Sequence, residues 1–145
     1  MNEMILKFPA RSENEVFARN AVAAFALPLN PSLTELSDVK TAVSEAVTNC
    51  IVHGYRGKAG WITITCRTVG CKLFVEIRDE GRGIEDIRQA LQPFFTTLPS
   101  EERSGMGFTI MQTFMSDFSV ESTVDAGTKV MMSKEFGIRE QRDAG

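Results

Sequence analysis

Apolar residues recur along the chain at strand-like and helix-like spacings, which predicts strands alternating with helices. Residues 4–8 form a short apolar run that ends at Pro9 and reads as a strand. Two stretches with helical spacing follow, and each opens with a Ser-x-x-Glu capping box, the first at Ser12 and the second at Ser32. The pattern predicts a helix of about 15 residues that ends before Pro28, and a longer helix that runs to about Gly54.

Each predicted helix carries an apolar stripe that should face a core. In the first helix the stripe consists of Val16, Phe17, Ala21, Val22 and Phe25. In the second helix it consists of Leu36, Val39, Val43, Val47 and Cys50.

The second half of the chain predicts a hairpin, a loop region, a helix and a final pair of strands. Residues 61–66 and 72–78 are rich in β-branched residues, with Gly70 near the turn between them. Residues 84–91 favour a short helix, and a loop then extends to Arg103. A last helix follows residues 105–107, and two strands flank the turn at residues 125–127.

This order of elements predicts an α+β fold, a two-layer sandwich with helices on one face of a mixed, mainly antiparallel sheet. The other sheet face is expected to remain open. Residues 1–136 should form one domain, and residues 137–145 a polar tail that frays.

Composition and charge narrow the possible functions. With 43% hydrophobic and 24% charged residues, the 145-residue chain resembles a globular protein. A net charge of -3 without a Lys/Arg cluster argues against nucleic-acid binding. Since no apolar run approaches the roughly 20 residues of a membrane span and no secretory signal is present, we expect a cytoplasmic protein.

The three cysteines do not suggest a metal centre. Cys50, Cys66 and Cys71 form no CxxC motif, and the chain has one histidine, so a tetrahedral zinc site lacks ligands. We expect all three to be free, buried thiols.

A carboxylate and an amide lie four residues apart in the second predicted helix, at Glu45 and Asn49. They share one face, roughly opposite the apolar stripe. Such a pair suits a general base beside a magnesium ligand. An exposed polar helix face remains the alternative interpretation.

Two glycine-bearing segments could approach a ligand closely. Asp79-x-Gly81-x-Gly83 directly follows a strand, so a carboxylate stands at the strand end beside two flexible residues. Ser104-Gly105-Met106-Gly107 opens the last helix, where free N–H groups can bind an anion, and Arg103 adds a positive charge. An ordinary turn and a flexible helix entry are the alternatives, and no Walker A or common protein-kinase signature is present.

The order of these segments resembles the N, G1 and G2 boxes of the GHKL ATPase/kinase superfamily, with Gly127-Thr128 as the final threonine element. Within it, the phrasing of residues 44–55, 78–84 and 103–111 is similar to the anti-sigma factor serine kinases, and most of all to the sporulation members of that family. The resemblance extends over essentially the whole chain and implies the ATP-binding fold of this superfamily, also called the Bergerat fold.

The resemblance also implies a role for each matching residue. Asn49 would hold Mg²⁺, Asp79 would accept from the adenine amino group, and Glu45 would act as the catalytic base, with Arg103 assisting at the phosphates. The implied nucleotide contacts are Asn49, Asp79, Gly81, Gly83, Ile84, Thr97, Arg103, Ser104, Gly105, Met106, Gly107, Phe108 and Thr128.

The activity implied is that of a homodimeric anti-sigma factor with ATP and Mg²⁺ as cofactors. It would bind and inhibit an RNA polymerase sigma factor, and phosphorylate a serine of a STAS-type anti-anti-sigma protein. The loop at residues 92–104 would switch between nucleotide states. A non-catalytic, nucleotide-dependent binding module is the alternative, and an ATPase that gates a dimer is a third hypothesis.

Other features allow two interpretations each. Glu15 and Arg19 could contact partners, as the family uses this region, or form an ordinary surface ion pair. His53 could reach the phosphates or cap the helix end. The methionines and phenylalanines of residues 106–118 are expected to pack in the core and in a lid.

Overall fold

The alternating apolar runs form one sheet in the computed structural model, which describes residues 1–92 and 107–137. Within those residues the sheet has five strands in the order β1-β2-β3-β5-β4. Their bounds are β1 Asn2–Pro9, β2 Trp61–Val69, β3 Lys72–Asp79, β4 Asp117–Thr123 and β5 Gly127–Glu135. The sequence predicted a mixed, mainly antiparallel sheet, but all pairings among the described strands are antiparallel. Each described strand runs in the opposite direction to the strand beside it.

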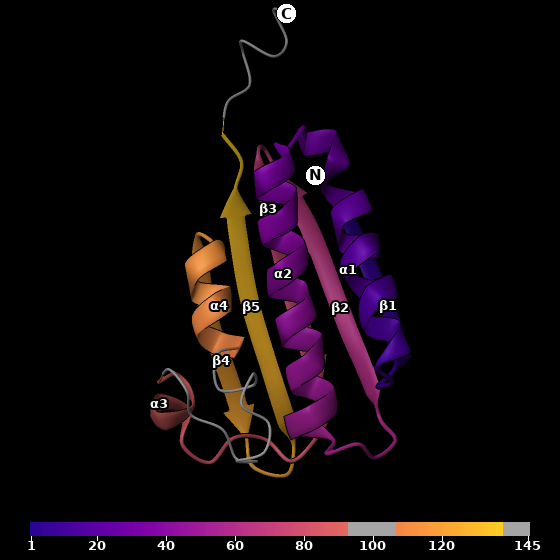
Figure 1. Cartoon of the computed structure of the whole chain (residues 1–145), viewed down its shortest axis with the longest axis vertical. Coiled ribbons are helices and arrows are strands. Elements are labelled where there is room, and N and C mark those ends of the chain that lie inside the picture. Colours follow the sequence, from indigo (N-terminus) through magenta and orange to yellow (C-terminus); the bar gives the residue numbers. More distant parts are fainter. Residues whose placement is uncertain (93–106, 138–145) are drawn as a thin grey trace, which may run out of the picture.

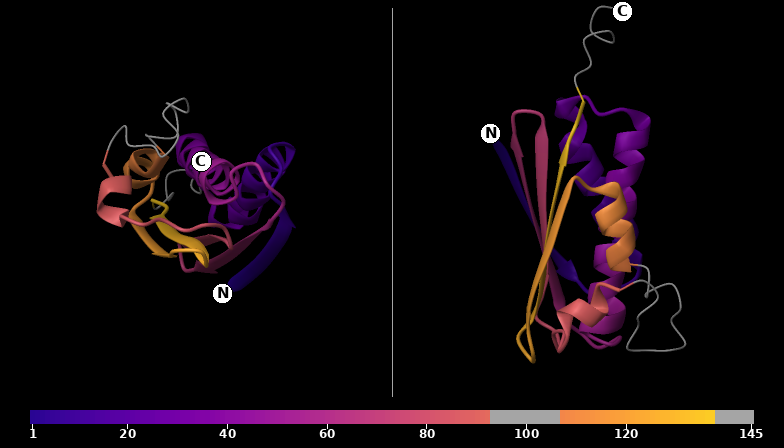
Figure 2. Two further views of the ribbon diagram at one scale, coloured as in Figure 1. Left: turned by 90° about the horizontal axis from the view of Figure 1, so that it is seen from below. Right: turned by 90° about the vertical axis from the view of Figure 1, so that its left-hand side faces the viewer.

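The helices lie together on one face of this sheet, as expected (Figures 1 and 2). Their bounds are α1 Glu13–Ala26, η1 Leu27–Leu29, α2 Leu33–Asn49, η2 Cys50–Gly54, α3 Ile87–Ala90 and α4 Gly107–Phe114. The buried residues of the core come from α1, α2 and α4 on one side and from alternate sheet positions on the other. No described helix is both long enough and apolar enough to cross a bilayer.

The two predicted capping boxes have different outcomes. At Ser32 the box is complete, because the Ser32 hydroxyl accepts from Glu35 N at 3.1 Å and the Glu35 carboxylate accepts from Ser32 N at 2.9 Å. At Ser12 the prediction is wrong. Ser12 makes no side-chain capping bond because its backbone is already helical, and the Glu15 N–H donates to the Ser12 carbonyl at 3.1 Å. The Glu15 carboxylate, the other half of the predicted box, is directed to Arg19 and Ser44.

The apolar stripe of α2 is largely confirmed, whereas that of α1 is partly wrong. Val39, Val43, Val47 and Cys50 are buried. In α1, however, Val16 and Phe17 are 46% and 52% exposed, and the buried face consists of Ala18, Val22, Ala23 and Ala26. Small residues allow α1 to pack closely on α2, which turns the larger side chains outward.

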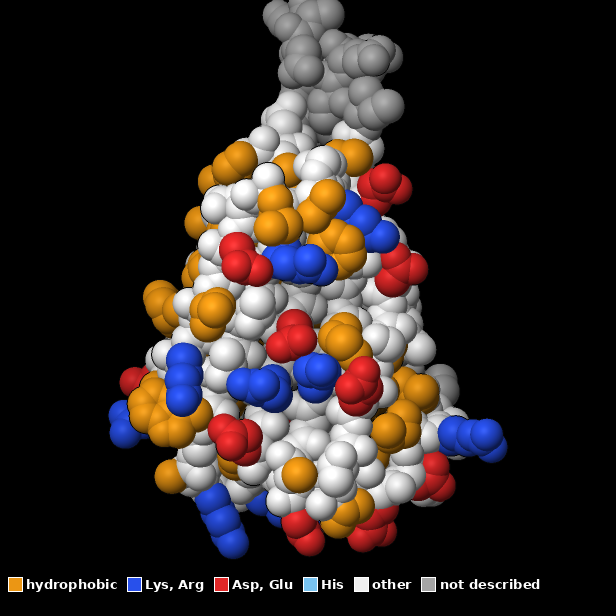
Figure 3. Space-filling model, turned by 180° about the vertical axis from the view of Figure 1, so that it is seen from behind, with side chains coloured by type: hydrophobic (Ala, Val, Ile, Leu, Met, Phe, Trp, Pro, Cys, Tyr) orange, Lys and Arg blue, Asp and Glu red, His pale blue; other side chains and the backbone are white. Residues whose placement is uncertain are grey.

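The rest of the sequence pattern is confirmed with small changes. The hairpin β2–β3 turns at Gly70, which has φ +59°. All three cysteines are free, but Cys71 is exposed rather than buried because it lies in this turn. The sheet face away from the helices is open and carries mixed charged and apolar side chains (Figure 3).

Candidate nucleotide site

A cavity of about 440 Å³ lies where the C-terminal end of α2, the segment after β3, the start of α4 and strand β5 meet. This volume falls in the range of small-molecule sites. Its lining residues are Ala46, Asn49, Cys50, His53, Gly54, Arg56, Ile77, Asp79, Arg82, Gly83, Ile84, Glu85, Asp86, Gln89, Ala90, Phe108, Thr128 and Val130.

The long helix ends in a π-helical turn, η2, directly beside this cavity. The turn leaves two backbone carbonyls pointing toward the segment after β3. The carbonyl of His53 accepts from Arg82 Nε at 2.9 Å, and the carbonyl of Gly54 accepts from Arg82 N at 3.0 Å. Arg82 therefore fastens the glycine-bearing loop to the helix end.

Asp79 is the buried carboxylate of the site, with 4% of its surface exposed. Its Oδ1 accepts from the backbone N–H of Gly81 at 2.8 Å and from that of Thr128 at 3.3 Å. Burial raises the pKa of Asp79, and hydrogen bonds from Gly81, the Cys50 thiol and Thr128 oppose that rise. Asp79 can thus present an acceptor beside the apolar side chains of Ile77, Ile84 and Val130 that line the cavity.

Both glycines of the loop are needed for close approach. A Cβ on Gly81 would collide with the carbonyl oxygen of Gly54. Gly83 has φ +76°, and a Cβ there would collide with the carbonyl oxygen of Thr123. The loop is therefore packed against η2 on one side and against the β4–β5 turn on the other.

Asn49 lies at the junction of α2 and α4. A Cβ on Gly107 would lie 2.8 Å from Asn49 Nδ2, so the first residue of α4 rests against this amide. Within the described ranges, Asn49 Oδ1 is the buried side-chain oxygen that has no hydrogen-bond partner. A buried acceptor without a donor is uncommon, and a water molecule, an ion or a ligand can satisfy it.

On the strand side of the cavity, two hydroxyl groups connect the lining residues by hydrogen bonds. The hydroxyls of Thr128 and Ser122 lie 2.8 Å apart. Ser122 Oγ also accepts from Ile84 N at 2.8 Å. Thr128 and Ile84 both line the cavity, so Ser122 couples the two predicted contacts.

The remaining predicted residues fall into three groups. Phe108 lines the cavity and packs on Phe118 with a ring-centroid distance of 5.7 Å. Glu45 lies one turn before Asn49 on α2, is half-buried, and is not among the lining residues. The other predicted contacts lie outside the described residues, and these are Thr97, Arg103, Ser104, Gly105 and Met106. Apart from Gln92, the predicted switch loop at residues 92–104 lies outside them too.

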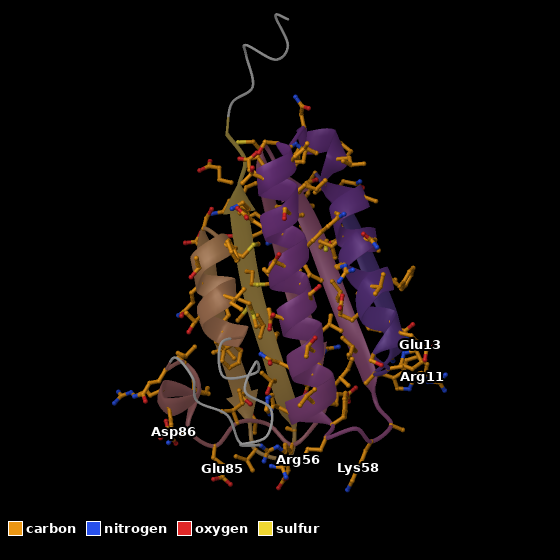
Figure 4. The ribbon with its side chains drawn as sticks, in the orientation of Figure 1. Arg11, Glu13, Arg56, Lys58, Glu85 and Asp86 are labelled. Atoms are coloured by element: carbon orange, nitrogen blue, oxygen red, sulfur yellow. The ribbon has the colours of Figure 1, made fainter. Side chains whose placement is uncertain are left out.

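His53 lies in η2 and is one of the residues that line the cavity, so it is both at the site and at the helix end. Charged groups surround the cavity mouth nearby. In the view of Figure 4, Arg56 lies below the end of α2, and Glu85 and Asp86 lie on the segment that leads into α3. Partial burial, and then the charge of Arg56, lower the pKa of Arg82.

Glu15 and Arg19 are remote from the cavity and form the expected ion pair, with 2.9 Å between Nη1 and Oε2. The Ser44 hydroxyl donates to the same Glu15 oxygen at 2.9 Å. Ser44 on α2 therefore holds the Glu15–Arg19 pair in place, whereas an isolated surface ion pair has no such third partner.

Several residues of the site were not predicted as site residues from the sequence. Cys50, Arg56, Arg82, Glu85, Asp86 and Gln89 are among those that line the cavity, and Ser122 contacts Ile84 and Thr128 from behind it. Cys50 was predicted as core and is buried there, and its thiol also donates to the Asp79 carboxylate. Arg82 lies between Gly81 and Gly83, and this position in the sequence could have identified it as a site residue. No local pattern distinguishes Ser122, because its partners are 5, 6 and 38 residues away.

Comparisons with known proteins agree with this geometry. Residues 8–134 match the family described as the histidine kinase-like ATPase domain. The chain is 58% identical over 136 residues to the anti-sigma F factor of Thermoanaerobacter sp., covering 94% of this chain and 95% of that protein. It is 53% identical over 139 residues to the anti-sigma F factor of Clostridium acetobutylicum, covering 96% and 97%.

Solved structures show the same fold at low sequence identity. The structure of the RsbU and RsbW domains of Rv1364c from Mycobacterium tuberculosis superposes with a TM-score of 0.70 at 14% identity, covering 96% of this chain and 34% of that chain. The catalytic domain of histidine kinase ThkA gives a TM-score of 0.57 at 16% identity, covering 92% and 96%. At such identities the likeness concerns the fold alone.

Proposed function

Because this chain belongs to the histidine kinase-like ATPase family and, within it, to the anti-sigma F factors, we propose that it inhibits a sigma factor and phosphorylates an anti-anti-sigma protein. ATP would be the phosphoryl donor. The observation that carries this proposal is the cavity in which the buried Asp79 carboxylate and the unpartnered Asn49 oxygen both lie.

Asp79 suits recognition of an adenine amino group. Two backbone N–H groups already hold Oδ1, so the carboxylate is fixed in orientation before a ligand arrives. The raised pKa follows from burial and is limited by these donors. The surrounding side chains of Ile77, Ile84 and Val130 offer apolar contact to a purine ring.

Asn49 suits a magnesium ligand, since its oxygen is buried and lacks a donor among the described residues. No group of three or more His, Cys, Asp or Glu side chains gathers in the described part of the chain to hold a metal by itself. Mg²⁺ held by one amide would therefore depend on nucleotide phosphates and water for its other ligands.

Glu45 is the residue we propose as general base, one helical turn from Asn49. Magnesium-bound ATP would supply the phosphoryl group and neutralise charge that develops on it. Glu45 would take the proton from the attacking serine hydroxyl of the partner. Arg103, with Thr97 and the residues at 104–106, would contact the phosphates from the segment before α4.

The α1 surface is the site we propose for protein partners. Glu15 and Arg19 are held by Ser44, and the neighbouring Val16 and Phe17 are exposed. A charged pair next to exposed apolar side chains fits the composition of protein interfaces. We also propose that the protein forms a homodimer, through either this helix or the open sheet face (Figure 3). We propose that it acts in the cytoplasm, where sigma factors function.

Transfer of label from γ-labelled ATP to a STAS-type partner tests the proposal. In Glu45→Gln, which removes the base but keeps the side-chain shape, transfer should fall about 100-fold or more while ATP still binds. Asn49→Ala should lose the magnesium-dependent part of ATP binding in addition to label transfer. Glu121→Gln is the matched control, because Glu121 lies on β4 and pairs with Lys129 away from the cavity.

A non-catalytic binding module is the second candidate. It would give nucleotide-dependent partner binding with no label on the partner in any variant. That result would remove Glu45 and Arg103 from the catalytic assignment. Phosphate release without any partner protein would favour a gating ATPase instead.

A further inference from the structure

Tyr55, the single tyrosine of the chain, follows η2 and lies where three segments meet. Its backbone N–H donates to the carbonyl of Cys50 at 2.9 Å and so completes the π-helical turn. Its ring lies against Gly60, where a Cβ would collide with the ring carbons. The tyrosine ring is therefore fixed between the helix end and the entry to β2.

The Tyr55 hydroxyl fills a gap where the sheet opens. Strands β2 and β3 are paired as far as Ile62 and Asp79, and beyond that point the two chains separate. The hydroxyl donates to the carbonyl of Trp61 at 2.6 Å and accepts from Glu80 N at 2.7 Å. It thus replaces the next backbone pair of the ladder with a bridge through a side chain.

This bridge determines how the chain leaves β3. Glu80 is the residue between Asp79 and Gly81, and its N–H is held by the hydroxyl. The next N–H, that of Gly81, donates to Asp79 Oδ1 at 2.8 Å. Because these two amides belong to consecutive residues, fixing the first restricts the direction of the second.

Burial favours the form of the hydroxyl that can make both bonds. Removal from water raises the pKa of Tyr55, with Asp79 and Cys50 adding smaller contributions and hydrogen bonds with Glu80 and Trp61 opposing them. The phenol is therefore protonated at neutral pH and keeps its donor for Trp61.

We propose that Tyr55 is a positioning residue for purine recognition, acting through the Glu80 amide to fix the carboxylate of Asp79. The inference rests on the proposed nucleotide site and extends it to a residue that does not line the cavity. The physical reason is preorganisation, because a carboxylate that can rotate loses part of its preference for an adenine over a guanine edge.

Tyr55→Phe tests this directly, since it keeps the ring against Gly60 and removes only the bridge. Calorimetric titration with magnesium-ATP should show about five- to tenfold weaker binding, the effect of about one lost hydrogen bond. The preference for ATP over GTP should fall by a similar factor. With a STAS partner, kcat at saturating ATP should remain within about twofold, so the loss appears in KM.

Two further variants separate positioning from general stability. Thr41→Val removes another hydroxyl-to-backbone bond, of 3.0 Å to Ser37, on the same long helix, and should leave the ATP/GTP preference unchanged. Replacing the single tyrosine by 3-fluorotyrosine keeps the hydroxyl and should keep the preference. Exchange of the Glu80 amide hydrogen should accelerate in Tyr55→Phe alone.

Binding of ATP by the wild type with the same ATP/GTP preference in Tyr55→Phe would overturn the inference and leave the proposed function standing. A wild type that binds neither nucleotide would overturn both.

Discussion

Asp79 shows how one buried side chain ties ligand binding to stability. Its pKa is raised mainly because burial removes water from the carboxyl. The folded protein therefore holds this proton more tightly than the unfolded chain does. The resulting contribution favours folding below the ordinary pKa of an aspartate and is lost as the pH rises through the raised value. An ionised carboxylate at this buried position is therefore kept at the expense of stability.

The variant Asp79→Asn should separate these two roles. Its side-chain oxygen can still accept from Gly81 and Thr128, but it carries no charge, so the melting temperature at pH 7 should equal or exceed that of the wild type. The difference in melting temperature between Asp79→Asn and the wild type should vanish in acid, once the wild-type carboxyl is protonated. Adenine nucleotide affinity should fall roughly 10- to 100-fold. Calorimetry over a pH series from acid to neutral measures both, and a clearly lower melting temperature of Asp79→Asn at pH 7 would contradict the linkage.

At the scale of single elements, the helix starts offer a matched pair of serines. Ser32 makes a complete capping box with Glu35 at the start of α2, whereas Ser12 makes no side-chain capping bond at the start of α1. Ser32→Ala should therefore lower the free energy of unfolding by about 1 kcal/mol, and Ser12→Ala by a few tenths at most. Urea denaturation of the two variants measures this difference, and equal losses would refute the structural distinction.

The exposed side of α1 is the second element with a testable role. Phe17 is 52% exposed although its spacing predicts a core position. If α1 binds the protein partners, Phe17→Ser and Arg19→Ala should each weaken sigma-factor binding about tenfold or more. The melting temperature should change little in Phe17→Ser, because that side chain is not in the core. Pull-down or interferometry with Val69→Ser as an exposed control on β2 distinguishes a helix interface from a general loss.

At the scale of the whole molecule, ligand binding should couple α2, the loop after β3, α4 and β5. These elements meet at one cavity, so a nucleotide bound there would hold them together. At a concentration about 100 times its Kd, ADP with Mg²⁺ should add about 2.7 kcal/mol to stability. The melting temperature should then rise by about 5–10 °C. Asn49→Ala should keep only the magnesium-independent part of this rise, and an equal rise with and without Mg²⁺ in the wild type would contradict the role of Asn49.

Much of the candidate site could be predicted because its chemical groups lie in short, continuous segments of the sequence. Asp79, Gly81 and Gly83 lie within five consecutive residues that begin at the last residue of β3, and Asn49 lies at the end of a strongly periodic helix. The contributions of Ser122 and Tyr55 could not be predicted from local spacing. Their hydrogen-bond partners include residues 38 and 25 positions away, which only the folded sheet brings together.

The sequence by itself determined the order of strands and helices and the helices on one face of a sheet, because periodicity, capping residues and glycines act over a few neighbouring residues. The main groups of the cavity followed from the resemblance of three short segments to a known family. The tertiary structure decided the fully antiparallel pairing, the outward rotation of Val16 and Phe17, the π-helical end of α2 and the fixed orientation of Asp79. These features depend on which surfaces meet, and close packing between distant segments overrides local preference at those positions.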